Sequence, residues 1–399
     1  MFAKTPVLLM LSLLLPGIAT ANVEQSERAT FRVERIAGGL QNPWAVAFLP
    51  DGGYLVTERP GRLRLIDADG RVQPQAITGL PEVTAFGQGG LLDVALHPEF
   101  ETNRWVYLSY AEAGRGGVAT AVARGRLDGL QLRDTEVLFR LLPKSRASRH
   151  FGSRLVFDND GYLFITLGDR GDRPRAQDLA DHAGSLIRLH DDGRIPDDNP
   201  FVGNDRARPE IYSYGHRNPQ GLVVAPGGTV WLHEHGPRGG DEVNRIEAGE
   251  NYGWPAVTYG VDYSGAVVSP YSEWPGMVSP LWDWTPSIAP SGLLLYQGDR
   301  FPQWRGDLLA GALVLAGGGA FVVRLAGAHP EQAWQVQFDP PVRDQLVFQL
   351  EDSEAGWGAY QDGHVYCFYC DRAACEHSRP ASMLEVFRGY DSMGKPEWC

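Results

Sequence analysis

Short apolar runs recur along the chain in pairs, and each pair is separated by a turn rich in glycine, proline and aspartate. The run 44–49 (WAVAFL), for example, leads into Pro50–Gly53 and then into 54–57 (YLVT). Two β-prone runs around such a turn predict a β-hairpin. Helical periodicity is nearly absent, so the sequence predicts an all-β protein. The pattern recurs at 92–96 with 105–108, 154–157 with 162–165, 221–224 with 229–232 and, less regularly, 292–296 with 308–313.

The hairpin units recur every 50 to 70 residues, and a third strand is predicted after some of them, as in 62–66 and 185–189. Units at such a spacing are typical of radial repeats, in which each sheet packs against the next. The sequence therefore predicts a β-propeller of four-stranded antiparallel sheets. Five units can be read. A sixth is expected from the residues after about Val336, closed by an N-terminal strand near Phe31 to Ile36.

The first 21 residues have the pattern of a secretory signal peptide. Met1 to Lys4 is short and basic, residues 7–15 are apolar, and Ala19 to Ala21 provides the small residues of a cleavage site. We therefore predict cleavage after Ala21 and a periplasmic or secreted protein, with an uncleaved membrane anchor as the alternative. No later apolar run reaches the roughly 20 residues that a membrane span requires.

Composition narrows the choice of partners. The chain has 36 Lys and Arg against 49 Asp and Glu, which gives a formal net charge of -13. This charge argues against nucleic acid as a partner, because phosphates attract a basic surface. It fits a protein that acts on a neutral substrate or binds cations.

Four sequence strings carry the most specific signal, and they are RHFGSRLVFDNDGYLFITLGDRG (149–171), HAGSLIRLHDDGRIPDDNPF (182–201), YSYGHRNPQGL (212–222) and EHGPRGGDEVNRIEAGENYGWP (234–255). GQGGLLDVALHPEF (87–100) and WTPSIAPSG (284–292) support them. In this order the strings resemble the soluble pyrroloquinoline quinone (PQQ)-dependent aldose sugar dehydrogenases, and the resemblance extends from about Gly38 to Leu325. It implies a six-bladed β-propeller, PQQ and calcium as cofactors, and oxidation of an aldose at its anomeric carbon to the lactone.

Oxidation at an anomeric carbon needs a base for the hydroxyl proton, and His150 is the candidate. Histidine titrates near pH ~6.5, so it can be neutral and accept a proton at working pH. Asp169 lies just past the partner strand of the same predicted hairpin, where its carboxylate could orient the imidazole. The resemblance assigns these two roles to these positions. Without it, His150 would be interpreted as a loop histidine and Asp169 as a turn aspartate.

The resemblance also assigns residues that contact the cofactor and the substrate. Arg217 and Asn218 match residues at the quinone carbonyls, where charge develops as the hydride arrives, and their donors would stabilise that charge. The alternative is an exposed loop arginine beside an asparagine that opens a proline turn. Ser287 falls where the family has a hydroxyl residue in contact with PQQ. Gln88 matches a glutamine that contacts the substrate.

Calcium is a further implication of the resemblance, and it prefers oxygen ligands. The carbonyls of Gly236 and Pro237 match those that hold the ion bound to PQQ. A second, structural calcium would use Glu242, the carbonyl of Tyr252 and Asp262. The His-Glu-His string just before Gly236 suggests zinc as an alternative, although a third zinc ligand is not evident.

The pattern departs from the family near the C-terminus. Residues 311–320 contain no Lys or Arg where the family has a basic residue for a PQQ carboxylate, and only Arg343 remains of a later arginine pair. The resemblance ends after Asp344. We therefore assign 22–344 to the propeller and 345–399 to a divergent tail in place of the expected end of the sixth blade, which would leave the last blade incomplete.

All four cysteines of the chain lie in this tail. A shifted reading frame would explain the abrupt loss of pattern, and translation of the gene in the other frames after Asp344 tests this. The rival hypothesis is a true extension stapled by disulfides, as is common in exported proteins. A zinc site at Cys367, Cys370 and His377 is a weaker alternative.

Three functions are compatible with these residues, since a propeller hosts many chemistries. The first is PQQ-dependent oxidation of an aldose, which needs a separate electron acceptor because the sequence has no haem-attachment motif. The second is a non-catalytic or inactive extracellular propeller that binds a ligand, suggested by the missing basic residues. The third is a calcium-dependent hydrolase such as a lactonase. The sequence indicates neither the sugar nor an oligomeric state.

Overall fold

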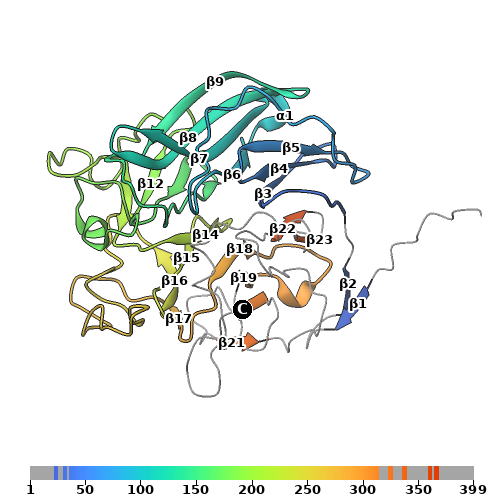
Figure 1. The fold of residues 1–399 in the computed structure, drawn as a ribbon. Coiled ribbons are helices and arrows are strands. Elements are labelled where there is room, and N and C mark those ends of the chain that lie inside the picture. The colour runs from blue at the N-terminus through green and yellow to red at the C-terminus, as the bar shows by residue number, and fades with distance from the viewer. Residues whose placement is uncertain are drawn as a thin grey trace, which may run out of the picture.

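The computed structural model of the chain describes residues 22–25, 30–33, 36–313, 322–326, 335–338, 358–361 and 364–367. In this part of the chain, regular structure is almost entirely β. Antiparallel sheets follow one another around a ring (Figure 1). The prediction of an all-β propeller is confirmed.

Each sheet is built from strands that are consecutive in the sequence, as expected for hairpins joined by short turns. A three-stranded sheet contains β3 (Pro43–Phe48), β4 (Tyr54–Glu58) and β5 (Arg62–Ile66). The four-stranded sheets contain β6 (Leu91–Leu96), β7 (Trp105–Gly114), β8 (Gly117–Asp128) and β9 (Gln131–Arg140); β10 (Leu155–Phe157), β11 (Leu163–Thr166), β12 (Ser185–Leu189) and β13 (Ile211–Tyr214); β14 (Pro219–Val224), β15 (Val230–Glu234), β16 (Asp241–Ile246) and β17 (Trp282–Trp284); and β18 (Pro290–Leu295), β19 (Leu308–Ala312), β20 (Val322–Ala326) and β21 (Gln335–Phe338).

Helical structure in the described residues is limited to short turns. There is one turn of α-helix, α1 (Phe100–Asn103), and there are two 3₁₀ turns, η1 (Arg173–Gln177) and η2 (Pro302–Trp304). No helix in the described ranges has the length and apolar character needed to cross a membrane.

The number of four-stranded sheets differs from the prediction. Four sheets in the described part of the chain have four strands, where six were expected. In the first sheet, residues 72–77 lie along β5 but form only isolated bridges, between Val72 and Ile66 and between Ile77 and Leu63. Pro74 lies between these bridges and has no backbone N–H to donate, so a regular fourth strand is interrupted there.

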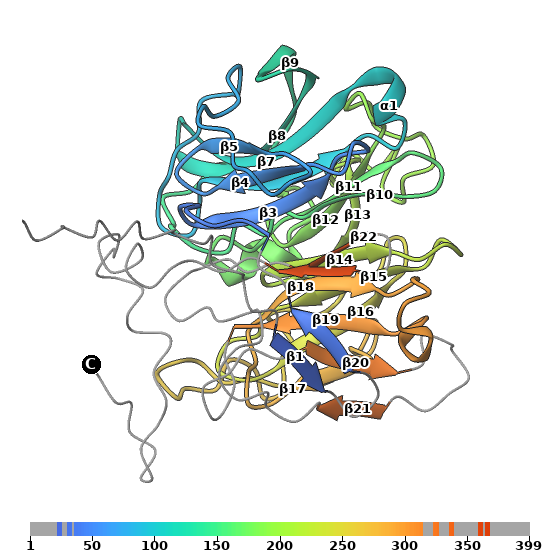
Figure 2. The same ribbon diagram turned by 90° about the vertical axis from the view of Figure 1, so that its right-hand side faces the viewer.

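The closing elements of the ring also differ from the prediction. The expected closing strand near Phe31 to Ile36 overlaps β2 (Thr30–Val33), which pairs with β1 (Asn22–Gln25) in a separate hairpin. A second hairpin, β22 (Gly358–Gln361) and β23 (His364–Cys367), lies between the fifth and first sheets, where β22 contacts β18 and β3 (Figure 2). The signal peptide, Arg343 and the rest of the tail lie outside the described residues, so the hypotheses about them stay predictions.

Apolar side chains fill the space between neighbouring sheets. Leu108 of β7 is buried against Leu55 and Leu92 in the core between the first two sheets. The adjacent Tyr107 points the other way and packs with Leu163 of the next sheet. Because side chains alternate between the faces of a strand, each sheet contributes to two cores. Full burial of one such leucine stabilises the fold by roughly 1.5–3 kcal/mol.

A side chain at one recurring position of the second strand links three of the sheets to the next one. Each lies beside a register shift in the first strand of its own sheet. Such a hydrogen bond contributes about 1 kcal/mol, and it ties the end of one sheet to the start of the next. The bonds run from Thr57 Oγ1 to the Leu92 carbonyl (2.6 Å), from Ser109 Oγ to the Ser153 carbonyl (2.7 Å) and between His233 Nε2 and the Gly292 carbonyl (3.2 Å).

Candidate active site

The candidate residues lie at one edge of the sheets, in the connections between strands. His150 precedes β10, and Asp169 follows β11. Because successive strands are antiparallel, the start of one strand and the end of the next lie at the same edge. Arg217 in the β13–β14 connection and Gly236 after β15 lie at the corresponding edge of the next sheet. The topology therefore gathers residues that are far apart in the sequence.

His150 and Asp169 are joined by a short hydrogen bond. His150 Nδ1 lies 2.6 Å from Asp169 Oδ1, and the two side chains are 11% and 1% exposed. A carboxylate acceptor at Nδ1 favours the tautomer that carries the proton there, which leaves Nε2 as the basic nitrogen. No group among the described residues hydrogen-bonds to Nε2. The imidazole is therefore oriented as a general base requires.

Two further donors hold Asp169 in place. Trp254 Nε1 donates to Asp169 Oδ2 at 2.8 Å, and the Gly171 N–H donates to Oδ1 at 2.6 Å. The role of Trp254 was not predicted. Its indole N–H can only donate, which suits a carboxylate, but the residue is 85 positions from Asp169 in the sequence, and only the fold shows the contact.

The backbone around the base adopts an unusual conformation. His150 has a φ of 56°, in the left-handed region that few non-glycine residues occupy. Its N–H donates to Gln88 Oε1 at 2.7 Å, so Gln88, predicted to contact the substrate, also holds the backbone of His150. A Cβ atom at Gly168 would lie 2.2 Å from the His150 carbonyl oxygen, so glycine is required at this close approach.

Burial and positive neighbours keep the imidazole neutral. Burial is the main cause that lowers the pKa of His150 to about 4, and Arg217 and Arg149 add to it against the opposing effect of Asp169. Burial acts to raise the pKa of Asp169, but its hydrogen bond to His150 and the nearby positive charges outweigh burial and hold the pKa below its ordinary value. At neutral pH the pair is therefore a neutral imidazole beside a carboxylate.

Arg217 and Asn218 lie next to this pair, and both are buried. Arg217 Nη1 donates to the His235 carbonyl at 3.0 Å, and the guanidinium carbon lies 5.3 Å from the centre of the Trp254 ring. Asn218 Oδ1 accepts the N–H of Gly152 at 3.3 Å. Within the described residues, Arg217 Nε and Nη2 and Asn218 Nδ2 have no acceptor, so both side chains retain donors for a ligand.

The His-Glu-His string does not form a zinc site. His233 contacts the Gly292 carbonyl and His235 the Pro290 carbonyl, whereas Glu234 accepts from His216 Nδ1 at 2.8 Å and from the Arg217 N–H at 2.5 Å. No cluster of three or more His, Cys, Asp or Glu side chains in the described ranges could hold a metal ion. The zinc interpretation is therefore wrong, and Glu234 instead fixes the backbone that carries Arg217.

Asp241 ties the two predicted ligand-binding turns together. Its Oδ1 accepts the N–H of Gly236 at 2.8 Å, and its Oδ2 accepts the hydroxyl of Ser287 at 2.6 Å. The N–H groups of Ile288 and Ala289 also donate to Oδ2, each at 2.8 Å. Burial raises the pKa of Asp241 above its ordinary value, although these hydrogen bonds act to lower it. The carboxylate thus fixes the Gly236–Pro237 turn beside Ser287, a role that the sequence did not reveal.

Comparison with known proteins identifies the family. The sequence matches the glucose / sorbosone dehydrogenase family over residues 40–346, which is most of the chain. The chain belongs to this family. The resemblance inferred from the four sequence strings is therefore confirmed.

Individual relatives agree with this assignment. The chain is 48% identical over 308 residues to aldose sugar dehydrogenase YliI of Escherichia coli K12, covering 75% of this chain and 82% of that protein. A solved glucose dehydrogenase matches with a TM-score of 0.73 at 45% identity, covering 81% of this chain and 90% of that one. The PQQ-bound aldose sugar dehydrogenase of Streptomyces coelicolor matches with a TM-score of 0.62 at 29% identity, covering 80% and 86%.

The residues suggested for a structural calcium each contact other groups in the structure. Burial, followed by the charge of Glu234, raises the pKa of Glu242 well above its ordinary value. Asp262 forms an ion pair with Arg173, and its Oδ1 accepts the backbone N–H of Ser264 in the same turn. The ring of Tyr252 stacks on His216 at 4.9 Å. Glu242 is thus a partly buried carboxylate beside that of Glu234, whereas Asp262 already has a cationic partner.

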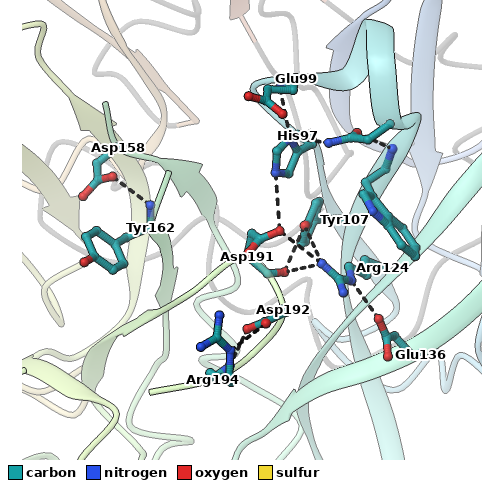
Figure 3. A network of polar contacts seen from close by, with 12 residues as sticks. His97, Glu99, Tyr107, Arg124, Glu136, Asp158, Tyr162, Asp191, Asp192 and Arg194 are labelled. Carbon is teal, nitrogen blue, oxygen red and sulfur yellow. Dashed lines mark hydrogen bonds and ion pairs between the residues drawn. The ribbon is translucent and has the colours of Figure 1, made fainter. Parts of the chain in front are cut away.

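A second histidine–aspartate contact lies at the opposite edge of the sheets (Figure 3). His97, after β6, is 3.5 Å from Asp191, which also accepts from Arg124. The ring of His97 packs on Phe157 at the far end of β10, the strand whose near end follows His150. This pair is looser than the His150–Asp169 pair, and it belongs to a network that joins the second and third sheets.

Proposed function

We propose that this chain oxidises aldoses at the anomeric carbon to lactones, with PQQ and calcium as cofactors and His150 as the general base. The observation that carries the proposal is the buried His150–Asp169 pair, in which the carboxylate orients the imidazole and Nε2 is left without a partner in the described residues. Membership of a family of sugar dehydrogenases supports the reaction type.

The residues around this pair fit an anionic quinone with a calcium ion. Arg217 and Asn218 keep N–H donors that would bind quinone oxygens, and Arg217 adds a positive charge. The carbonyls of Gly236 and Pro237, on a turn fixed by Asp241, would bind calcium through oxygen. Ser287 donates its proton to Asp241 and accepts the Ala289 N–H at 3.2 Å, so its oxygen keeps one further lone pair for a ligand donor. When bound, PQQ would supply the acceptor for the two electrons that leave the sugar.

The proton and the developing charge are handled by the chain's own residues. His150 Nε2 takes the proton of the anomeric hydroxyl while the hydrogen on that carbon leaves as hydride, so the C–O bond becomes the lactone C=O. Asp169 stabilises the imidazolium that results. The free donors of Arg217 and Asn218 stabilise negative charge that develops beside them. His150 then releases its proton to solvent.

Further parts of the proposal follow from the sequence. Residues 1–21 would be removed on export to the periplasm or outside the cell, and residues 22–344 would belong to the propeller. Arg343 would bind a PQQ carboxylate. Glu242, the Tyr252 carbonyl and Asp262 would hold a structural calcium once the Asp262–Arg173 pair opens, and Gln88 would contact the sugar. Electrons would pass to a separate acceptor.

Reconstitution tests the proposal directly. Adding PQQ and calcium to the purified chain is expected to give dye reduction that requires an aldose, because Asp169 orients the His150 imidazole and Arg217 keeps N–H donors for a ligand. Rates are measured with several aldoses, without sugar, and with PQQ or calcium omitted. Bound PQQ without sugar-dependent reduction would favour the non-catalytic propeller, and hydrolysis of lactones without PQQ would favour the lactonase.

The pH dependence provides a second test. Because the pKa of His150 is about 4, the imidazole is neutral above pH ~5, and kcat/KM should fall tenfold per pH unit only below pH ~4. Replacing Arg149 by glutamine removes a positive neighbour, which raises this pKa and moves the acid limb up by roughly 0.3 pH units, since Arg149 is exposed and screened. A wild-type acid limb near pH ~6.5 would contradict a buried base.

A further inference from the structure

Arg170, directly after Asp169, is a fully buried arginine whose hydrogen bonds go to backbone carbonyls. Its Nη2 donates to the Ala147 carbonyl at 2.7 Å, and its Nη1 donates to the Arg149 carbonyl. The guanidinium carbon lies 3.4 Å from the centre of the Phe151 ring. No carboxylate among the described residues pairs with it, and its Nε has no acceptor there. Burial lowers the pKa of Arg170 to about 9, so the side chain remains charged at neutral pH.

The Ala147, Arg149 and Phe151 contacts fall on the segment that carries His150, and one longer hydrogen bond, from Nη2 to the Val118 carbonyl at 3.5 Å, reaches β8. Residues 147, 149 and 151 surround His150, and each is held by the same guanidinium. The segment needs such a restraint because His150 has a positive φ and is not glycine. The backbone of Arg170 continues from Asp169, so one residue connects both partners of the His150–Asp169 pair.

We propose that Arg170 is a positioning residue for the general base, which clamps residues 147–151 so that His150 meets Asp169 with its Nε2 turned to the substrate. The base role rests on the proposed function, but the clamp itself does not. Arginine suits the task because its planar fork reaches two carbonyls two residues apart while its face stacks on an aromatic ring. A lysine ammonium carries its three N–H donors on one nitrogen and has no planar face, so it cannot bind both carbonyls and stack on the ring in the same way.

The alternative is that Arg170 only adds stability. Arg188 provides a matched control, because it is also a buried arginine stacked on an aromatic ring, 3.9 Å from the centre of Tyr162, at the other end of the same sheet. Its hydrogen bonds go to Asn199 and Asp198 and not to the segment of the base. Arg170→Lys and Arg188→Lys therefore remove comparable packing at different places.

The test uses the full chain reconstituted with PQQ and calcium. Arg170→Lys is expected to lower kcat about 10- to 100-fold with KM changed less than about twofold, because a displaced base slows the chemical step more than binding. Arg188→Lys is expected to leave kcat within about twofold of the wild type. Wild-type kcat for Arg170→Lys would overturn the proposal, as would equal losses in both variants.

A readout without cofactor separates this proposal from the proposed function. Histidine-labelled apoprotein is titrated by NMR, with the His150 signal assigned through His150→Gln. In Arg170→Lys the His150 pKa should rise from about 4 toward the solvent value of ~6.5, because the ring leaves its buried position. In Arg188→Lys it should not move. An unchanged titration in Arg170→Lys refutes the clamp, whereas a shifted titration in a chain with no dehydrogenase activity refutes only the proposed function.

Discussion

Replacing His150 by alanine is expected to lower kcat for aldose oxidation about a thousandfold. A positioned general base contributes roughly 10²–10⁴-fold. His216, which also contacts a carboxylate at this edge of the sheets, has its Nε2 within 2.9 Å of the Ser213 hydroxyl, whereas Nε2 of His150 has no partner in the described residues. Binding of PQQ should change little, because the donors of Arg217 and Asn218 remain. Steady-state dye reduction measures kcat and KM, and fluorescence or absorbance titration measures the affinity for PQQ.

His97→Ala is the matched control for this prediction. His97 also contacts an aspartate (Figure 3), but it follows the end of β6 at the opposite edge of the sheets, so its replacement should leave kcat unchanged. Asp169→Asn should lower kcat at least about 100-fold. The carboxylate accepts hydrogen bonds from three sides, so the N–H₂ group of an asparagine would face another donor and would no longer orient the His150 imidazole. If His150→Ala retained more than about a tenth of the wild-type rate, His150 would not be the base.

The strand units of the fold could be predicted because their signals are local. The predicted runs 44–49 and 54–57 correspond to β3 and β4 within one residue at each end, and the less regular run 308–313 corresponds to β19. Alternation of apolar residues and turn chemistry suffice for such hairpins. The number of complete sheets was not predicted correctly, because the outer edge of the first sheet depends on Pro74 and the closing elements depend on long-range pairing.

The residues of the candidate site were likewise predictable only where the signal in the sequence is local. Asp169 could be paired with His150 because the two residues flank one hairpin. Trp254 and Glu234 could not be predicted, since the first lies 85 residues from Asp169 and the second was read as part of a metal cluster. Asp241 and Glu242 are neighbours on a strand and point to opposite faces, and the sequence alone did not reveal which one reaches the Gly236 turn.

Removal of the Asp241 carboxylate should destabilise the chain more than loss of a surface charge. Asp241→Ala leaves the N–H groups of Gly236 and Ile288 without their acceptor in a buried position, and it removes the shorter of the two hydrogen bonds of the Ala289 N–H and the acceptor of the Ser287 hydroxyl. Unpaired buried donors cost about 1–3 kcal/mol each, and relaxation recovers part of this, so we expect a loss of about 3–5 kcal/mol. Urea unfolding should show a lower midpoint with an unchanged slope.

The nearly isosteric Asp241→Asn and a neighbouring aspartate make this prediction specific. An asparagine oxygen can keep the Oδ2 contacts while its N–H₂ group faces the Gly236 N–H, so this variant should lose about 2 kcal/mol, mostly at the turn of Gly236 and Pro237. It should also weaken binding of calcium, measured by calorimetry on the PQQ-loaded chain, because the carbonyl ligands lose their anchor. Asp283→Asn is the control: within the described part of the chain its carboxylate accepts one hydrogen bond, from the Thr285 hydroxyl at 3.2 Å, and less than about 1 kcal/mol should be lost. Equal stability of Asp241→Asn and the wild type would mean that the Gly236–Pro237 turn is held by its own backbone and that Asp241 is not its anchor.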